Sequence, residues 1–227
     1  TYFADRYVGA RAGFASGMTI SRQATADTTN LPFIPYCARV QRTNGDTSTA
    51  SLQTNMALES IDSVAFAGKT VTVSFYMRTG ANYSGASSFF FGLLTQTGGT
   101  EYKAINFPSP VYALSQTIAS IPTTWTRYSY TATLPSNITQ IGMLWNYSPT
   151  GTAGANDYFD ITGIQLELGS TATNFSRAGG SIANERNICA TWYVRFNGGN
   201  AYERIGHGYI ASTTDANLVV HLPTVMR

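Results

Sequence analysis

The residues of this sequence that could carry out catalysis are few. Its only histidines, His207 and His221, lie near the end of the chain, where turn or surface positions explain them better than a catalytic role. The sequence has no glycine-rich phosphate loop, no His-Glu-x-x-His motif and no Gly-x-Ser-x-Gly motif around a nucleophile. These absences predict a protein that is not an enzyme.

Carboxylates offer one further route to chemistry. A glycosidase needs two of them on opposite sides of a cleft, and the acids nearest to expected strand ends are Glu101, Asp157, Asp160 and Glu167. Nothing pairs any two of these acids, so we interpret Asp160 and Glu167 as acceptors from an arginine or as loop anchors. Asp157 and Asp160 could together hold a structural calcium ion, although two acids fall short of its oxygen-rich shell. We otherwise expect no cofactor.

Aromatic residues are the stronger lead, because flat rings beside a few polar groups are a common lining of ligand sites. The chain contains 14 Tyr and 3 Trp. We expect candidate glycan-binding residues on the solvent face of one strand, in the loop after it, and at the end of a later strand that precedes the loop 148–156. In that order they are Tyr76 and Arg78, then Tyr83, then Trp145 and Tyr147.

Each of these aromatic residues has an alternative explanation. Trp145 shares a strand face with Ile141 and Met143, which favours a place in the core. Tyr76 and Tyr83 could equally pack against another subunit.

The strands that must position these residues are visible as alternation with a period of two. In the clearest case, Val71, Val73, Phe75 and Met77 face one way and polar residues face the other, as expected for a strand with one wet face. Residues 89–94 are almost continuously apolar, which predicts a strand covered on both faces. Further strands are expected at residues 14–22, 36–42, 126–131 and 138–147. Residues 44–46, Asn-Gly-Asp, are predicted to form a hairpin turn between Val40 and Leu52.

Residues 157–175 contain a strand whose apolar period changes phase. Phe159 and Ile161 set one period, and Ile164 and Leu166 restart it after Gly163. A shift of phase requires an inserted residue, so we predict a β-bulge at Gly163.

The same region resembles a segment of tailed-phage virion proteins, mostly tail-fibre, tail-spike and baseplate chains. The resemblance covers residues 161–195, and the opening Asp5, Arg6 and Tyr7 match a second element of these proteins. The usual tyrosine pair before Arg195 is replaced here by Trp192 and Tyr193. The matching residues are Gly163, Gln165, Leu166, Glu167, Gly169, Ala172, Thr173, Phe175, Cys189, Tyr193 and Arg195, with Trp192 at the altered position.

A second stretch is similar to jelly-roll carbohydrate-binding modules and to the phage domains built like them. Its matching residues are Glu59, Gly68, Lys69, Val71, Val73 and Phe75. The sequence predicts about eight to ten strands. Together with these resemblances, this number implies an all-β fold, an antiparallel jelly-roll β-sandwich over residues 1–176. Its N-terminal strand would be supplied by residues upstream of this sequence. Residues 177–227 would hold a short helix within 181–195, capped by Ser181, and the start of a small β module with strands at 202–205, 208–212 and 218–222.

Composition limits the classes of molecule that this chain is expected to bind. Only 11% of residues are charged, with 14 basic and 12 acidic side chains, and scattered basic residues argue against binding nucleic acid. No apolar run approaches the length of a membrane span. Cys37 and Cys189 do not fit a disulfide framework or a metal site, and we interpret them as two separate buried thiols.

The resemblance implies a structural virion protein, a fragment of a longer fibre or appendage chain at the tail or another external part of a phage. Its domain would attach to host-surface glycan or connect modules, as a homotrimer in contact with other virion proteins. One alternative is a polysaccharide depolymerase, which should show paired carboxylates in a groove. The other is a capsid-decorating module without a ligand, with Tyr76, Arg78 and Tyr83 buried between subunits.

Overall fold

The computed structural model describes residues 2–4, 7–11, 17–31, 33–85, 89–98, 100, 104–177, 180–190 and 207–219. The chain divides into two compact units, Thr1–Phe175 and Ser176–Arg227. Several residues singled out in the sequence lie outside the described part: Asp5, Arg6, Glu101, Trp192, Tyr193, Arg195 and His221.

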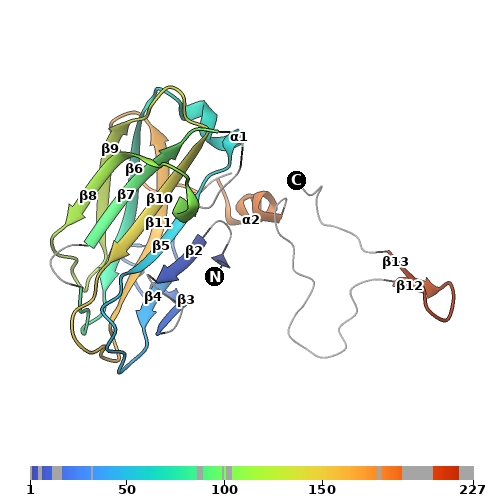
Figure 1. Cartoon of the computed structure of the whole chain (residues 1–227), viewed down its shortest axis with the longest axis horizontal. Helices are drawn as coiled ribbons and strands as arrows, with labels where there is room; N and C mark the ends of the chain where they lie inside the picture. Colours follow the sequence, from blue (N-terminus) through green and yellow to red (C-terminus); the bar gives the residue numbers. More distant parts are fainter. Residues whose placement is uncertain are drawn as a thin grey trace. The chain divides into compact units, whose positions relative to one another are not determined.

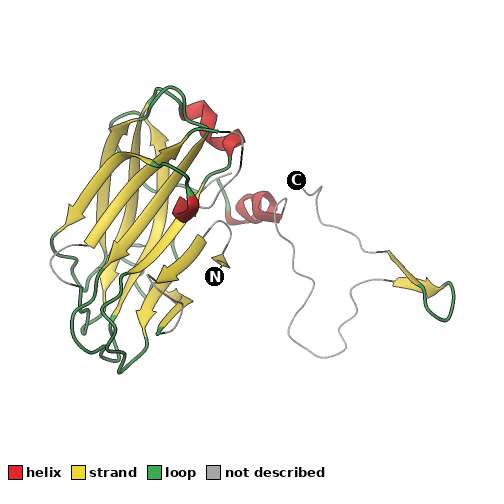
Figure 2. Cartoon of the chain, in the orientation of Figure 1, coloured by secondary structure: helices red, strands yellow, loops and turns green. Residues whose placement is uncertain are grey.

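The first unit is a sandwich of two antiparallel sheets (Figures 1 and 2). Sheet A has six strands in the order β1 (Tyr2–Ala4), β2 (Tyr7–Arg11), β5 (Leu52–Ala57), β10 (Gln140–Tyr147), β7 (Phe89–Gln96) and β8 (Val111–Ile118). Sheet B has five, in the order β3 (Met18–Ala24), β4 (Tyr36–Arg42), β11 (Tyr158–Leu168), β6 (Thr70–Thr79) and β9 (Thr126–Thr133). The short helices α1 (Ser60–Ser63), η1 (Val64–Phe66) and η2 (Ala104–Asn106) lie in connections. The predicted all-β jelly-roll sandwich is confirmed.

Aromatic rings from both sheets fill the space between them. The inward residues of β6 are those that alternation predicted, and Val71, Val73, Phe75 and Met77 are fully buried. The ring of Phe75 lies 4.9 Å from that of Phe91 and 5.5 Å from that of Trp145, centroid to centroid. Because Phe75 belongs to sheet B and the other two to sheet A, these contacts join the layers.

The phase change in β11 is a β-bulge, as predicted. Pairing with β6 shifts register between Thr162 and Gln165, and Gly163 has φ of +57°. A Cβ atom at Gly163 would lie 2.9 Å from Ile34 Cδ1 and 3.0 Å from Tyr76 Cδ2. Both the backbone angle and the tight packing therefore require glycine.

The hairpin predicted around residues 44–46 is wrong. A turn is present, since the Asp46 amide donates to the Thr43 carbonyl at 3.0 Å and Gly45 has φ of +82°. However, β4 belongs to sheet B and β5 to sheet A. Residues 43–51 therefore cross from one sheet to the other, because local turn chemistry does not decide which strands pair.

Strand positions elsewhere follow the prediction in most cases. The strand predicted at 36–42 matches β4, and those predicted at 89–94, 126–131 and 138–147 correspond to β7, β9 and β10. The strand predicted at 14–22 begins at Met18 in the described part of the chain. No strand was predicted at β8, which pairs with β7 along its length.

The second unit contains α2 (Ile182–Ala190) and a hairpin of β12 (His207–Ile210) and β13 (Ala216–Val219). The predicted cap is confirmed, because Ser181 Oγ accepts from the Asn184 amide at 3.2 Å. The hairpin falls near the strands predicted at 208–212 and 218–222, and the strand predicted at 202–205 lies outside the described residues. Within the described part of the chain, no helix is long and apolar enough to cross a membrane.

Candidate functional site

The outer face of sheet B carries Tyr76 and Arg78, as the alternation of β6 predicted. Tyr76 is half-buried and packs against a small apolar cluster that includes Ile34 and Trp125. The Arg127 guanidinium lies 5.7 Å from the centre of the Tyr76 ring. Because protein groups occupy its surroundings, Tyr76 offers little free ring surface for stacking on a sugar.

Arg78 is held by a buried carboxylate. Its Nε donates to Asp160 Oδ2 at 2.9 Å, while Arg39 donates from Nε to Oδ1 at 2.7 Å and from Nη2 to Oδ2 at 2.9 Å. The two guanidinium groups also stack on aromatic rings, Arg78 on Trp125 at 4.7 Å and Arg39 on Tyr158 at 3.5 Å. The interpretation of Asp160 as an acceptor from arginine is confirmed. Its charge is neutralised within the fold.

Glu167 anchors the loop that follows β11. Its Oε2 accepts from the Thr173 amide at 3.1 Å and its Oε1 accepts from the Thr173 hydroxyl, while Gln165 Nε2 donates to that hydroxyl oxygen at 3.1 Å. Desolvation acts to raise the pKa of Glu167, but the hydrogen bonds from Thr173 and Gln165 outweigh it, and the pKa lies below its usual value. The phage-like motif thus builds a covered face: Gln165 and Glu167 hold the loop, and Phe175 packs against the same apolar cluster as Tyr76.

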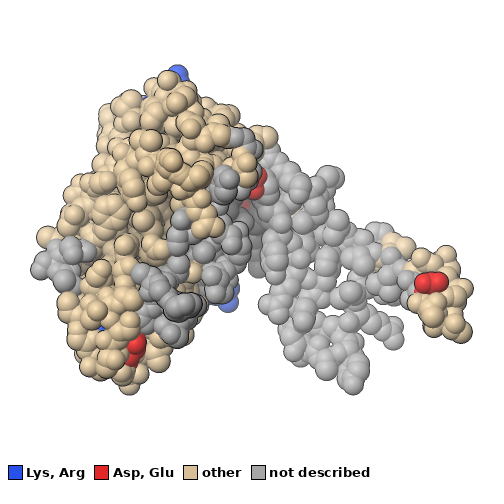
Figure 3. Space-filling model, in the orientation of Figure 1, with Lys and Arg blue, Asp and Glu red and all other residues tan. Residues whose placement is uncertain are grey.

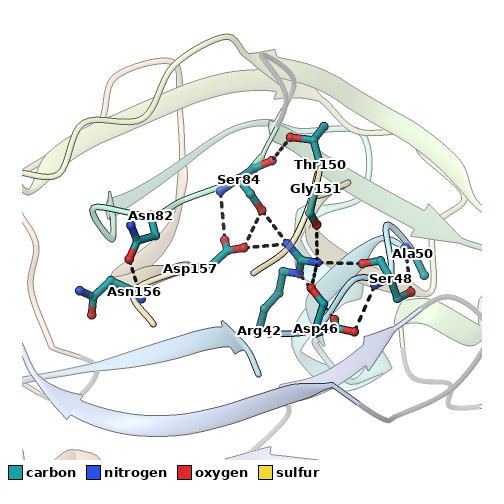
Figure 4. Close-up of polar contacts among 10 residues, drawn as sticks. All are labelled: Arg42, Asp46, Ser48, Ala50, Asn82, Ser84, Thr150, Gly151, Asn156 and Asp157. Atoms are coloured by element: carbon teal, nitrogen blue, oxygen red, sulfur yellow. Dashed lines mark hydrogen bonds and ion pairs between the residues drawn. The ribbon is translucent and has the colours of Figure 1, made fainter. Parts of the chain in front are cut away.

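Arg42 is fully buried at one end of the sandwich and ties three loops together (Figure 4). Its Nη1 donates to Asp157 Oδ2 at 2.8 Å and to Ser84 Oγ at 2.9 Å. Asp157 also accepts from the amide of Ser84 at 3.0 Å and from its hydroxyl at 2.6 Å. Nη2 of Arg42 donates to three carbonyl oxygens, those of Asp46, Ser48 and Gly151, at 2.8, 3.0 and 3.1 Å.

The calcium site considered at Asp157 and Asp160 is therefore wrong. Each carboxylate is occupied by a guanidinium group, Asp157 by Arg42 and Asp160 by Arg39 and Arg78. A cation at either place would meet fixed positive charge. No group of three or more potential metal ligands occurs among the residues that the structure describes.

Trp145 and Tyr147 do not reach the surface. Their exposed fractions are 0% and 1%, so neither ring can stack on a glycan, and the core alternative for Trp145 is confirmed. Their place in the core follows from the inward phase of β10, which they share with Met143. Tyr83 is half-buried, with its ring 4.9 Å from that of Tyr147.

The outer face of sheet A was not considered in the sequence, yet it carries a row of polar and aromatic side chains. In register across four neighbouring strands lie Gln53, Asn146, Phe90 and Thr117, which we call the amide–aromatic row. All four are at least partly exposed. The signal was present, because a strand that turns Trp145 and Tyr147 inward must turn Asn146 outward.

A second ring lies beside this row. Tyr112 is 45% exposed and its ring centre lies 6.0 Å from that of Phe90, at an interplanar angle of 68°. Gly92 separates the two rings, and a Cβ atom there would lie 3.0 Å from Cε1 of each. The missing side chain lets the rings of Phe90 and Tyr112 pack edge to face over Gly92. Farther along the same face, Leu94 is covered by Ala104 and Phe107.

This arrangement suits an uncharged, hydroxyl-rich ligand. The rings of Phe90 and Tyr112 provide apolar contact, and the amide of Gln53 can both donate and accept hydrogen bonds. The amide oxygen of Asn146 is buried. No member of the row is charged. In the view of Figure 3 the described surface of the first unit is mostly uncharged, with isolated charged groups and no basic patch.

Comparisons with solved structures find similar chains at low sequence identity. No protein-family model matches the chain, and no curated protein matches it. One similar structure is the enzymatically active domain of tailspike protein 4 of bacteriophage CBA120, with 11% identity and a TM-score of 0.49, covering 72% of this chain and 19% of that one. A CBM4 structure has 15% identity and a TM-score of 0.43, covering 72% of this chain and 86% of the other.

The CBM22-1 xylan-binding domain of Xyn10C from Paenibacillus barcinonensis is also similar, with 12% identity and a TM-score of 0.43. The match covers 72% of this chain and 87% of that domain. The fold assignment itself rests on the strand order and pairing described above.

Proposed function

We propose that this chain is a non-catalytic, glycan-binding domain of a tailed-phage appendage, and that the glycan lies across the outer face of sheet A. The observation that carries the proposal is the amide–aromatic row with the ring of Tyr112 beside it. Neighbouring strands are about 4.8 Å apart, so a row across four strands offers contacts along an extended ligand. Rings and amides without charge favour a neutral glycan.

Three of the acids considered for catalysis are bound within the fold, which supports a non-catalytic role. Hydrolysis of a glycosidic bond requires one carboxylate as acid and a second as base or nucleophile. Asp157 and Asp160 are bound to arginines and Glu167 holds Thr173, so none of these three is available for that work.

The virion setting is supported by the resemblance of residues 161–195 to tailed-phage proteins. The resemblance also supports a homotrimer in contact with other virion proteins, on a tail or other external appendage. A shallow site of this kind binds weakly on its own, and several linked copies would raise the affinity for a cell surface through effective concentration. We therefore expect measurable attachment to depend on the multimer.

A glycan-array measurement on the multimeric protein tests the proposal. Wild type is compared with a Phe90→Ala, Tyr112→Ala double variant and with a control, Tyr36→Ala, which removes an exposed ring from sheet B. We expect a neutral bacterial glycan to bind to wild type and to the control, and binding to be lost in the double variant when circular dichroism shows it folded.

Two results would contradict the proposal. Folded wild-type multimer that binds no glycan would favour a connector or a decorating module. Binding that survives in the double variant and disappears with Tyr36→Ala would place the site on sheet B.

A further inference from the structure

The segment that crosses from sheet B to sheet A contains a reactive dipeptide, Asn44-Gly45. Both residues are exposed in the turn of residues 43–46. Asparagine is one of the thermolabile residues of proteins, and a glycine after it leaves the backbone nitrogen accessible, because glycine has no side chain to hinder its approach to the asparagine. This turn is therefore a candidate site of spontaneous chemical modification.

The modification is a deamidation that needs only water. The Gly45 nitrogen loses its proton and forms a bond to Cγ of Asn44, and the side-chain amide nitrogen leaves as ammonia, which closes a succinimide ring. Water then opens the ring at either of its two carbonyl carbons. One product has aspartate at position 44, and the other has isoaspartate, in which the backbone runs through the former side chain. Both products carry one additional negative charge.

The folded structure holds the nitrogen that would attack. The Gly45 amide donates to the Ala153 carbonyl at 2.8 Å, and the Ala153 amide donates to the Asp46 carbonyl at 2.8 Å. Gly45 has φ of +82° in this arrangement. The nitrogen attacks only after its proton leaves, and in the fold that proton lies in a hydrogen bond. Attack therefore requires the bond between Gly45 and Ala153 to break first.

Arg42 braces both segments that meet at this contact (Figure 4). Its Nη2 donates to the carbonyl of Asp46 on one segment and to that of Gly151 on the other, at 2.8 and 3.1 Å. Ser84 holds the same guanidinium group, because its hydroxyl oxygen accepts from Nη1 at 2.9 Å. Opening of the turn is therefore opposed by a hydrogen-bond network that is buried in the fold.

We propose that Asn44 is a site of spontaneous deamidation whose rate is set by local opening of this end of the sandwich. The pair is protected while Gly45 is bound to Ala153 and reacts only during opening. The product places a carboxylate two residues from Asp46, in a network where Asp46 and Asp157 already share one guanidinium group. Like charges repel, so one event favours further opening. This inference does not depend on the proposed glycan-binding function.

Peptide mapping by mass spectrometry on the full chain tests the proposal. The conversion of Asn44 is followed with time at mildly alkaline pH, in the folded protein and in urea. The other Asn-Gly pair of the sequence, Asn197-Gly198, is followed in the same samples as an internal reference. Two variants are compared with wild type: Ser84→Ala removes one hydrogen bond to Arg42, and Ser129→Ala, at an exposed serine of β9, is the matched control.

Hydrogen exchange at the Gly45 amide, measured by NMR on the wild-type chain, adds a readout that needs no variant. Exchange of this proton and deamidation of Asn44 both require the bond to Ala153 to break. Relative to the unfolded chain, the two reactions should therefore be slowed by the same factor, which we expect to be about tenfold or more.

We expect Ser84→Ala to speed deamidation of folded Asn44 about threefold or more, as loss of one hydrogen bond implies, and Ser129→Ala to leave the rate unchanged. In urea all three proteins should react alike. Equal rates for Asn44 in the folded protein and in urea would overturn the proposal, and so would different slowing factors for exchange and deamidation. A folded Ser84→Ala variant that reacts no faster than wild type would show that the network around Arg42 does not control the opening.

Discussion

The outer faces of the two sheets carry similar kinds of residue and use them differently. On sheet B the polar groups satisfy one another: Asp160 binds Arg39 and Arg78, Glu167 binds Thr173, and apolar side chains cover the strand ends. On sheet A, the partly exposed rings of Phe90 and Tyr112 pack against each other over Gly92. Residue type alone therefore does not identify a binding face. A binding face is identified by whether its polar groups already have protein partners and by whether its rings are exposed.

The largest expected effect is on the sheet B network. Asp160→Asn removes the charge that neutralises Arg39 and Arg78 and should lower the free energy of unfolding by about 3 kcal/mol, since breaking a buried ion pair leaves its partners uncompensated. Urea unfolding measures this loss. Glycan binding by the fraction that remains folded should be unchanged. A loss below about 1 kcal/mol is typical of an exposed ion pair. It would mean that solvent reaches the ion pairs of Asp160 on this face.

The bulge in β11 gives the next effect. Gly163→Ala places a side chain at φ of +57° and against Ile34 and Tyr76, and should destabilise the fold by about 2 kcal/mol or more. Gly151→Ala is the matched control, because its φ of +64° is similar and nothing lies within 4 Å of its added Cβ. The difference between the two variants in the free energy of unfolding, obtained from urea unfolding, measures the cost of packing against Ile34 and Tyr76. Equal losses of free energy would mean that Tyr76 moves aside without cost.

The pKa of the Cys37 thiol indicates how little water reaches the covered face of sheet B. Burial, then the nearby charge of Asp160, raises the pKa of its thiol to about 12. The folded thiol stays neutral while the unfolded one ionises near pH 9, so its contribution is complete below pH 9 and declines as pH rises from there towards 12. The slope is about 1.4 kcal/mol per pH unit.

This alkaline decline is measured as the difference in free energy of unfolding between wild type and Cys37→Ala at several values of pH above 9. Parallel curves would contradict a dry environment for the thiol. Slow alkylation of the folded protein near pH 8, compared with the unfolded chain, provides an independent check.

The smallest effect on stability, and a direct one on binding, is expected at Gly92. Gly92→Ala places a Cβ atom 3.0 Å from the rings of Phe90 and Tyr112 and displaces them, with little backbone strain. It should change the free energy of unfolding by less than about 1 kcal/mol. Affinity for the array glycan should fall. Undiminished array binding by Gly92→Ala would show that the two rings do not form the glycan site.

Strand periodicity was the most dependable information in the sequence. The inward residues of β6, the bulge at Gly163 and the strand at 36–42 follow from a period of two and from glycine's tolerance of positive φ. In contrast, β8 follows two prolines and alternates poorly, and its strand state comes from pairing with β7. The turn at residues 44–46 was visible, but its role as a crossing between sheets was not, because strand pairing depends on distant segments.

The candidate site was less accessible to sequence reasoning. Tyr76, Arg78 and Tyr83 were placed on the right strand and loop, but their partners come from distant positions in the chain. These partners are Arg127 for Tyr76, Asp160 for Arg78 and Tyr147 for Tyr83. Trp145 and Tyr147 were considered as ligand contacts although the phase of β10 turns them inward. The same phase points Asn146 outward, so this part of the amide–aromatic row could have been found.

By itself, the sequence determined the all-β class, the spacing of most strands and the scarcity of catalytic side chains, because these depend on local alternation and on composition. Only the tertiary structure decided which polar groups are already paired and which are left for a ligand. Asp160 meets Arg39 across 121 positions of sequence, and Phe90 meets Tyr112 across a shared sheet face. Such pairings are set by the register between strands, and no short stretch of sequence contains that register.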